Sequence, residues 1–143
     1  MTKRRRTETL AAAVTSLLAL SAPAQSCTIQ KPLRFESVRS AQIVFRAQLI
    51  NYVHSNSPGE TYRQATITFR VIEPLRGKIG EQLVATWRNE GGTPREWWHS
   101  RDLIVAAVAS ETGPRILQEL CTPAFMIDDS ETNLKKVREL LKE

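Results

Sequence analysis

Apolar and polar residues alternate along two long stretches in the middle of the chain, residues 42–53 and 62–75. Alternation over this length is typical of β-strands with one buried and one exposed face. The expected inward positions are Ile43, Phe45, Ala47 and Leu49 in the first stretch and Ala65, Ile67, Phe69 and Val71 in the second. The turn-forming residues between the two stretches, which include Pro58-Gly59, predict a hairpin.

Three further strands are predicted downstream, at residues 81–88, 101–109 and 115–120. The middle one contains the uninterrupted apolar run LIVAAVA, which is typical of a strand that is buried on both faces. Gly-containing turns at residues 76–80 and 111–114 precede the first and the last of these strands.

Helical patterns flank this strand-rich region. Residues 33–40 are expected to form a short helical or turn segment before the first strand. Apolar residues at helical spacing predict an amphipathic α-helix over residues 129–142, with Asp128 and Glu131 as a capping box. Together these elements predict a mainly β domain, a five-stranded OB-type Greek-key barrel with a C-terminal α-helix.

The first two dozen residues have the pattern of an export signal. Four basic residues, Lys3 to Arg6, precede an apolar run from Leu10 to Leu20, and the small residues Ser-Ala-Pro-Ala follow. This is the three-part pattern of a cleaved signal peptide, and the apolar run is too short for a comfortable membrane span. We therefore expect a signal peptide at residues 1–24, a single domain at residues 25–143, and secretion or export to the periplasm.

Removal of the signal changes the meaning of the net charge. The chain carries +5 at neutral pH, but residues 1–24 contain four basic residues and one acidic residue and account for +3 of it. The domain is left near +2, which does not indicate nucleic-acid binding. We expect no nucleic-acid partner, no transmembrane helix and a monomer.

The only two cysteines, Cys27 and Cys121, stand at opposite ends of the strand-rich region. In an exported protein two cysteines favour one disulfide. A bond between them closes a loop of roughly 95 residues, which is worth about 4–5 kcal/mol in the chain-entropy model. The alternative is a lipid-modified Cys27, but Ala24 and Gln25 match the residues expected before a lipidated cysteine poorly.

Five stretches carry a likeness to a known family: SCTI at the start of the domain, AQIVFRAQL, FRVIEPLRGKIG, RDLIVAAV, and LCTPAF before the C-terminal helix. In this order they resemble the netrin-like module, the OB-type fold of the tissue inhibitors of metalloproteinases and of bacterial exported relatives. The resemblance spans most of the domain. It implies an exported, non-catalytic binding module that acts through protein contacts, with a metalloprotease as a candidate partner.

The resemblance also implies a contact site. In the animal inhibitors, a mature N-terminal cysteine presents its amino group and carbonyl to the zinc of the target protease. The matching residues here are Cys27 and Thr28, so this contact requires cleavage directly before Cys27. Cleavage before Gln25, which the Ala-X-Ala pattern favours slightly, leaves two residues in front of the cysteine. The inhibitors begin with Cys-X-Cys, whereas this chain continues with Thr28-Ile29 and lacks several of their further cysteines.

A second candidate surface lies near the long loop at residues 89–100. Trp97, Trp98 and Arg101 combine aromatic rings with a guanidinium group, which suits contact with a sugar or with a partner protein. These residues support an alternative function as an envelope polysaccharide- or ligand-binding domain; a purely structural domain is a third possibility. Trp87, by contrast, is expected to cover one end of the barrel.

No pattern in the sequence predicts catalysis or a cofactor. The two histidines, His54 and His99, lie in expected loops without a cysteine or carboxylate at metal-ligand spacing. The glycines form no phosphate-binding loop. We therefore expect a protein that is not an enzyme and that carries neither a cofactor nor a metal.

Overall fold

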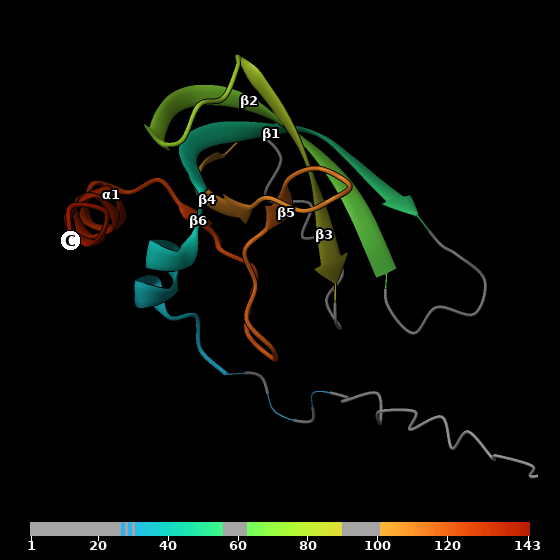
Figure 1. The fold of residues 1–143 in the computed structure, drawn as a ribbon, viewed down its shortest axis with the longest axis horizontal. Helices are drawn as coiled ribbons and strands as arrows, with labels where there is room; N and C mark the ends of the chain where they lie inside the picture. Colours follow the sequence, from blue (N-terminus) through green and yellow to red (C-terminus); the bar gives the residue numbers. More distant parts are fainter. Residues whose placement is uncertain (1–26, 28, 30, 56–62, 90–100) are drawn as a thin grey trace, which may run out of the picture.

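Figure 1 shows a computed structural model of the chain, which describes residues 27, 29, 31–55, 63–89 and 101–143. Its elements are the 3₁₀ helix η1 (Phe35–Ser40), the strands β1 (Ile43–Ser55), β2 (Arg63–Arg76), β3 (Gln82–Asn89), β4 (Asp102–Val108), β5 (Arg115–Ile116) and β6 (Met126–Asp128), and the helix α1 (Glu131–Leu140). The structure is mainly β with a C-terminal α-helix, as the sequence predicts. The predicted signal segment lies outside the described residues.

The sheet closes on itself into a five-stranded barrel. The strands are hydrogen-bonded in the order β1-β2-β3-β5-β4, and β4 pairs back with β1. Neighbouring strands are antiparallel except β3 and β5, which are parallel. This arrangement confirms the predicted OB-type barrel. The β3–β5 seam consists of the single pair Thr86↔Arg115, at which the Thr86 N–H donates to the Pro114 carbonyl at 2.9 Å.

Strand alternation places one set of side chains inside the barrel, as predicted. The buried residues that β1 and β2 contribute to this inner cluster are Phe45, Ala47, Leu49, Ala65, Ile67 and Phe69. The rings of Phe45 and Phe69 pack edge to face with their centroids 5.5 Å apart, which is a preferred geometry for aromatic pairs. Trp87, which was expected to cover one end of the barrel, is buried in the same cluster.

A second apolar cluster lies outside the barrel, between its wall and the two helices. Its buried residues are Val38, Ala41, Val44, Ile104, Ala106, Leu117, Phe125 and Val137. Along β4, Leu103 and Val105 belong to the inner cluster, whereas Ile104 and Ala106 belong to this outer one. The prediction of a strand buried on both faces is therefore confirmed. Figure 1 shows η1 and α1 on the same side of the barrel.

One arginine fastens both helices to the barrel wall. Arg76, the last residue of β2, donates hydrogen bonds to the carbonyl oxygens of Arg39, Ala41 and Leu141 at 3.0, 3.2 and 3.3 Å. These carbonyls lie at the C-terminal ends of η1 and α1, where helices leave carbonyl groups without an intrahelical partner. Arg76 therefore stabilises two helix ends at once.

The fifth strand is much shorter than the predicted residues 115–120. β5 has two residues, after which the Leu117 N–H donates to the Ala106 carbonyl of β4 at 2.8 Å. The chain then forms a loop that contains Cys121, and it returns to β4 as β6, a strand that the sequence pattern did not predict. The φ of Cys121 is 63°, which lies in the left-handed region and is incompatible with a continuous strand.

The C-terminal helix is confirmed, but its predicted cap is wrong. The N-cap of α1 is Ser130, whose hydroxyl accepts a hydrogen bond from the Asn133 N–H at 3.2 Å. Serine is well suited to this position because its short side chain reaches the free amides of the first turn. The helix starts two residues later and ends two residues earlier than the predicted range 129–142.

Candidate functional site

The two cysteines are joined, as predicted. Cys27 and Cys121 are 94 positions apart in the sequence, with a sulfur–sulfur distance of 2.11 Å and a Cα–Cα distance of 5.4 Å. A second bond lies close by, because the Lys31 N–H donates to the Cys121 carbonyl at 2.8 Å. The segment 27–31 is thus attached to Cys121 at both ends. The disulfide indicates an oxidising environment, and it occupies the thiol that lipid modification of Cys27 requires.

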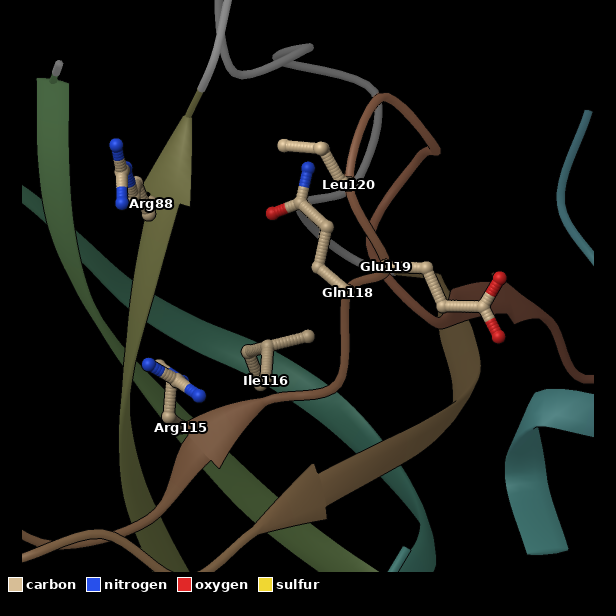
Figure 2. A pocket seen from close by; sticks show the side chains of 6 residues that line it. All are labelled: Arg88, Arg115, Ile116, Gln118, Glu119 and Leu120. Carbon is tan, nitrogen blue, oxygen red and sulfur yellow. The ribbon is translucent and has the colours of Figure 1, made fainter. Parts of the chain in front are cut away.

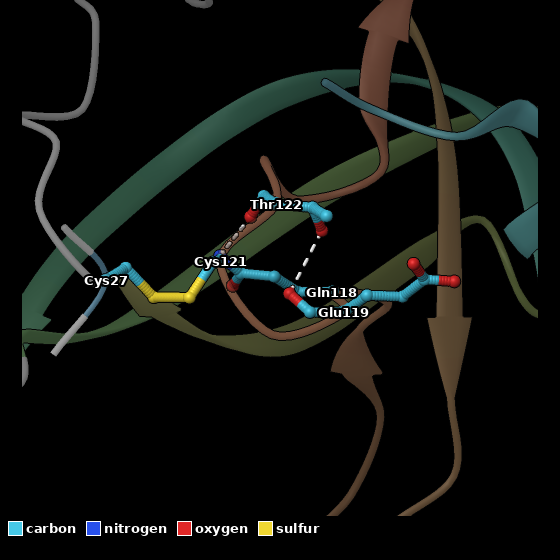
Figure 3. The surroundings of a disulfide bond; sticks show 5 residues. All are labelled: Cys27, Gln118, Glu119, Cys121 and Thr122. Atoms are coloured by element: carbon cyan, nitrogen blue, oxygen red, sulfur yellow. Dashed lines mark hydrogen bonds between the residues drawn. A yellow bond between two sulfur atoms is a disulfide. The ribbon is translucent and has the colours of Figure 1, made fainter. Parts of the chain in front are cut away.

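Hydrogen bonds of Gln118 fix the loop that carries Cys121 (Figure 3). The Gln118 side-chain oxygen accepts from the indole N–H of Trp87 at 3.0 Å, and its side-chain nitrogen donates to the Thr122 carbonyl at 2.9 Å. The hydroxyl of Thr122 donates to the Glu119 carbonyl at 3.0 Å. The left-handed backbone of Cys121 is therefore held by a loop that is itself bonded to the barrel core through Trp87.

Two large apolar side chains close in sequence to the two cysteines are exposed. Ile29, in the segment attached to Cys121, is 79% exposed, and Leu120 is 55% exposed. These are the two highest values among the large apolar residues that the structure describes. Exposed apolar side chains near a covalent restraint offer a candidate contact surface. We name the surface formed by Cys27, Ile29, Lys31 and residues 118–122 the disulfide end.

A pocket of about 160 Å³ adjoins the disulfide end, where β3 and β5 diverge. It is lined by Arg88, Arg115, Ile116, Gln118, Glu119 and Leu120. Figure 2 shows the two arginines on the β3 and β5 side, Gln118 and Leu120 extending from the loop, and the Glu119 carboxylate directed away from the arginines. Sites for drug-sized ligands have volumes of roughly 300–1,000 Å³, so this pocket suits a single charged group or one sugar ring.

The main ion-pair network lies at a different place, beneath α1. Arg46 of β1 donates to Asp129 at 2.7 Å and to Glu73 of β2 at 2.8 Å, and Glu73 also pairs with Arg138 of α1 at 2.7 Å. The Asp129 side chain is 1% exposed, and its Oδ1 has no hydrogen-bond partner within the described part of the chain.

Hydrogen bonding within this network shifts two pKa values. The hydrogen bond from Arg46 is the largest cause that lowers the pKa of Glu73, and the bond to Glu73 is the largest cause that raises the pKa of Arg46. Both shifts favour the charged forms. Because the network joins two barrel strands to α1, we assign it to the attachment of the helix and not to chemistry.

The structure brings together only part of the predicted contact residues. Cys27 and Cys121 are adjacent, as expected. Arg101 is exposed and pairs with Asp128 of β6 at 3.3 Å. Outside the described residues lie Thr28, Trp97 and Trp98, so the predicted aromatic surface remains a prediction.

The sequence reasoning did not find the pocket. Arg88 and Arg115 belong to separate stretches of the chain, and only the pairing of β3 with β5 makes them neighbours. Gln118 was expected within a strand and instead lies in the loop beyond it. In an OB-type barrel the third and fifth strands are neighbours. The predicted barrel could therefore have placed Arg88 and Arg115 side by side and indicated the site.

One of the two histidines does not lie as predicted. His54 belongs to β1 and not to a loop, and its ring packs edge-on against Tyr52 with 4.7 Å between the centroids. His99 lies outside the described residues. Within residues 27, 29, 31–55, 63–89 and 101–143, no group of three or more His, Cys, Asp or Glu side chains is placed to hold a metal ion. In the same part of the chain, no helix has the length and apolar character needed to cross a membrane.

A scan against protein-family models finds no match for this chain, and a search of curated proteins finds none either. The netrin-like resemblance is therefore neither supported nor contradicted by these comparisons. It stays a prediction from the order of the cysteines, the strands and the helix.

Proposed function

We propose that this chain is an exported, non-catalytic protein-binding module that contacts its partner with the disulfide end. The observation that supports this most is the exposure of Ile29 and Leu120, which lie close in sequence to Cys27 and Cys121. Burial of a large aliphatic side chain is worth about 1.5–3 kcal/mol. Because the disulfide and the Lys31 hydrogen bond restrain this surface in advance, less conformational entropy is lost when a partner binds.

The partner that we propose is a zinc metalloprotease. The supporting feature is the cysteine at the start of the domain, which matches the zinc-binding residue of the tissue inhibitors. The disulfide holds the backbone of Cys27 beside the exposed loop of Leu120 and Cys121. This version requires signal cleavage directly before Cys27, since Gln25 and Ser26 otherwise separate the amino group from the protease zinc.

The disulfide and the N-terminal signal pattern together support a location in the periplasm or outside the cell. Disulfides persist in oxidising surroundings such as the periplasm and the extracellular space. We propose that the domain acts there as a monomer. Intact mass of the exported protein, before and after reduction, checks the cleavage site, any lipid and the state of both thiols in one measurement.

Inhibition of zinc endopeptidases tests the partner. The protein is prepared in two disulfide-bonded forms, one that begins at Cys27 and one that begins at Gln25, and both are titrated against a panel of zinc endopeptidases. We expect inhibition by the first form and much weaker inhibition by the second, because only the first offers its terminal amino group beside the Cys27 carbonyl. A natural N-terminus at Gln25, together with no inhibition by either form, rules out this partner.

Substitutions at the disulfide end test the contact surface. Ile29→Ser and Leu120→Ser each remove an exposed apolar side chain, and we expect each to weaken inhibition by about tenfold or more if its side chain is buried in the complex. Ile72→Ser is the matched control, since Ile72 is an exposed isoleucine on β2. An equal loss with the control contradicts the assignment of the contact to the disulfide end.

A further inference from the structure

A second surface of the barrel has a different chemistry from the disulfide end. It consists of the outward positions of β2 from Gln64 to Arg70, those of β3 from Gln82 to Arg88, and Arg115 of β5. Register places these positions side by side, because Thr66 pairs with Thr86, and Thr86 in turn pairs with Arg115. The intervening β2 residues point into the barrel. We name this surface the outer β2–β3–β5 face.

All charges on the outer β2–β3–β5 face are positive. Its nine residues are three arginines, three threonines, two glutamines and one valine. Within the described part of the chain, no ion pair forms at Arg70 or Arg115. Each guanidinium group is positively charged, so three of them on one face create a positive potential that attracts anions. For Arg70 and Arg115, the described residues therefore supply no counter-charge.

The pocket lies at the edge of this face and brings two of the three arginines together. Arg115 pairs with Thr86, and Arg88 follows two residues later on the same strand, so the two arginines are diagonal neighbours on one face. The side chain of Gln118, which forms the opposite wall, is held by its bonds to Trp87 and Thr122. Glu119 lines the rim with its carboxylate directed away from both arginines (Figure 2).

We propose that the outer β2–β3–β5 face binds an anionic polysaccharide, with one sulfate or carboxylate group seated in the pocket beside Arg88 and Arg115. Planar guanidinium groups match the paired oxygens of either anion. The pocket volume of about 160 Å³ accommodates one such group. This binding goes beyond the proposed protein contact and does not use Ile29 or Cys27, although the pocket shares Gln118, Glu119 and Leu120 with the disulfide end.

The composition of the face favours a polysaccharide over an acidic protein. Five of its nine residues are threonine or glutamine, whose hydroxyl and amide groups can pair with sugar hydroxyls. Cores of protein interfaces are instead rich in aromatic and apolar groups. The nine residues include no aromatic side chain and a single valine, Val84.

Binding of three polysaccharides to the disulfide-bonded protein tests the proposal. Heparin offers sulfate and carboxylate groups, polygalacturonate offers carboxylates alone, and dextran is neutral; calorimetry is performed at about 0.15 M salt, where exposed charges are screened beyond about 8 Å. We expect binding of heparin and none of dextran. Binding of polygalacturonate as well identifies carboxylate as sufficient, whereas binding of heparin alone identifies sulfate as the recognised group.

Matched charge variants locate the site. The triple variant R70Q/R88Q/R115Q is expected to lose about tenfold or more in affinity, since it removes three positive charges that can form charge-assisted hydrogen bonds with the polymer. The control R34Q/K135Q/K142Q removes the same charge at three exposed positions, before η1, within α1 and just after α1. We expect its affinity to fall much less. Thermal unfolding of both variants confirms that the barrel is intact.

Four results overturn the proposal: no binding of either anionic polymer, equal binding of dextran, an equal loss in the control variant, or equally tight binding of polyglutamate. The last identifies an acidic polypeptide as the ligand class. Ile29→Ser separates this proposal from the protein contact, because it is expected to leave heparin binding unchanged while it weakens protease inhibition.

Discussion

The outside of the barrel is built in two contrasting ways. Over β4 and the start of β1, the outward side chains, among them Val44, Ile104 and Ala106, are apolar and lie beneath η1 and α1. Over β2, β3 and β5, the outward positions carry hydroxyl, amide and guanidinium groups that do not belong to this apolar cluster. On both sides, alternate residues of each strand point into the barrel, and these apolar residues stabilise it. The outward residues determine whether a side packs against the helices or faces the solvent.

Arginine shows the same contrast. On the helix side, Arg46 and Arg138 are held in ion pairs and Arg76 donates to three carbonyl oxygens. On the outer β2–β3–β5 face, Arg70 and Arg115 form no ion pair with the described residues. The first group stabilises the fold, and the second is available to a ligand. Stability measurements on matched pairs of residues can test this division.

The largest effect is expected in the outer apolar cluster. Phe125 is fully buried, and its ring packs edge to face against Phe35 with 6.1 Å between the centroids. Phe125→Ala should lower the free energy of unfolding by about 3–5 kcal/mol, measured by urea denaturation. Val84→Ala, on the outer β2–β3–β5 face, is the comparison and should change the free energy of unfolding by less than about 0.5 kcal/mol. Equal effects of the two substitutions would show that the helices add little to the domain.

Loss of the disulfide should come next. The double variant C27S/C121S should lower the free energy of unfolding by about 2–5 kcal/mol, because the unfolded chain regains the freedom that the long loop closure removes. Denaturation of the unmodified protein under reducing conditions should give the same shift. A much smaller shift in both experiments would mean that the loop around Gln118 holds the disulfide end without the covalent bond.

A smaller loss is expected at Arg46. Arg46→Ala leaves the buried carboxylate of Asp129 without its hydrogen-bond donor, and an unsatisfied buried group of this kind costs about 2–3 kcal/mol. Arg70→Ala, on the outer β2–β3–β5 face, is the control and should change the free energy of unfolding by less than about 0.5 kcal/mol. The division between structural and available arginines fails if the two substitutions cost the same.

The smallest effect should appear in the pH dependence. The pKa of Glu73 is lowered in the folded state, chiefly by the hydrogen bond from Arg46. A lowered folded pKa adds stability above the unfolded pKa of glutamate, and this stability is lost as the pH falls through the folded pKa. Glu73→Gln should therefore flatten the acid side of the stability curve by less than about 1 kcal/mol, because the side chain is partly exposed. Glu81→Gln, which removes a carboxylate that forms no ion pair with the described residues, is the control, and an equal flattening with this variant would contradict the role of the Arg46 hydrogen bond.

The barrel strands were largely predictable because each long strand has one face inside. The predicted ranges of β1 to β4 agree with the structure to within two residues at each end. β5 and β6 were not predictable in the same way, since strands of two and three residues are too short to show a period. Both strands pair with β4. The loop between them contains the left-handed residue Cys121, whose conformation depends on tertiary contacts.

The candidate sites also differ in how far they could be predicted from the sequence. The disulfide followed from cysteine count and export, which are properties of the sequence. The pocket depends on which strands become neighbours, and no local pattern relates Arg88 to Arg115. Asp129 illustrates the same difficulty: the sequence placed it at the start of the predicted helix, whereas in the fold it precedes the helix and is the buried partner of Arg46.

The position of the two cysteines also orders events during synthesis. Chains emerge from the N-terminus, so the thiol of Cys27 appears early and waits for that of Cys121, which follows 94 positions later. By then all five barrel strands have emerged, since β5 ends at Ile116. Oxidation therefore marks the completion of the barrel and cannot guide its early steps. An unfinished chain carries a free thiol, a chemical label by which incomplete molecules can be told from finished ones.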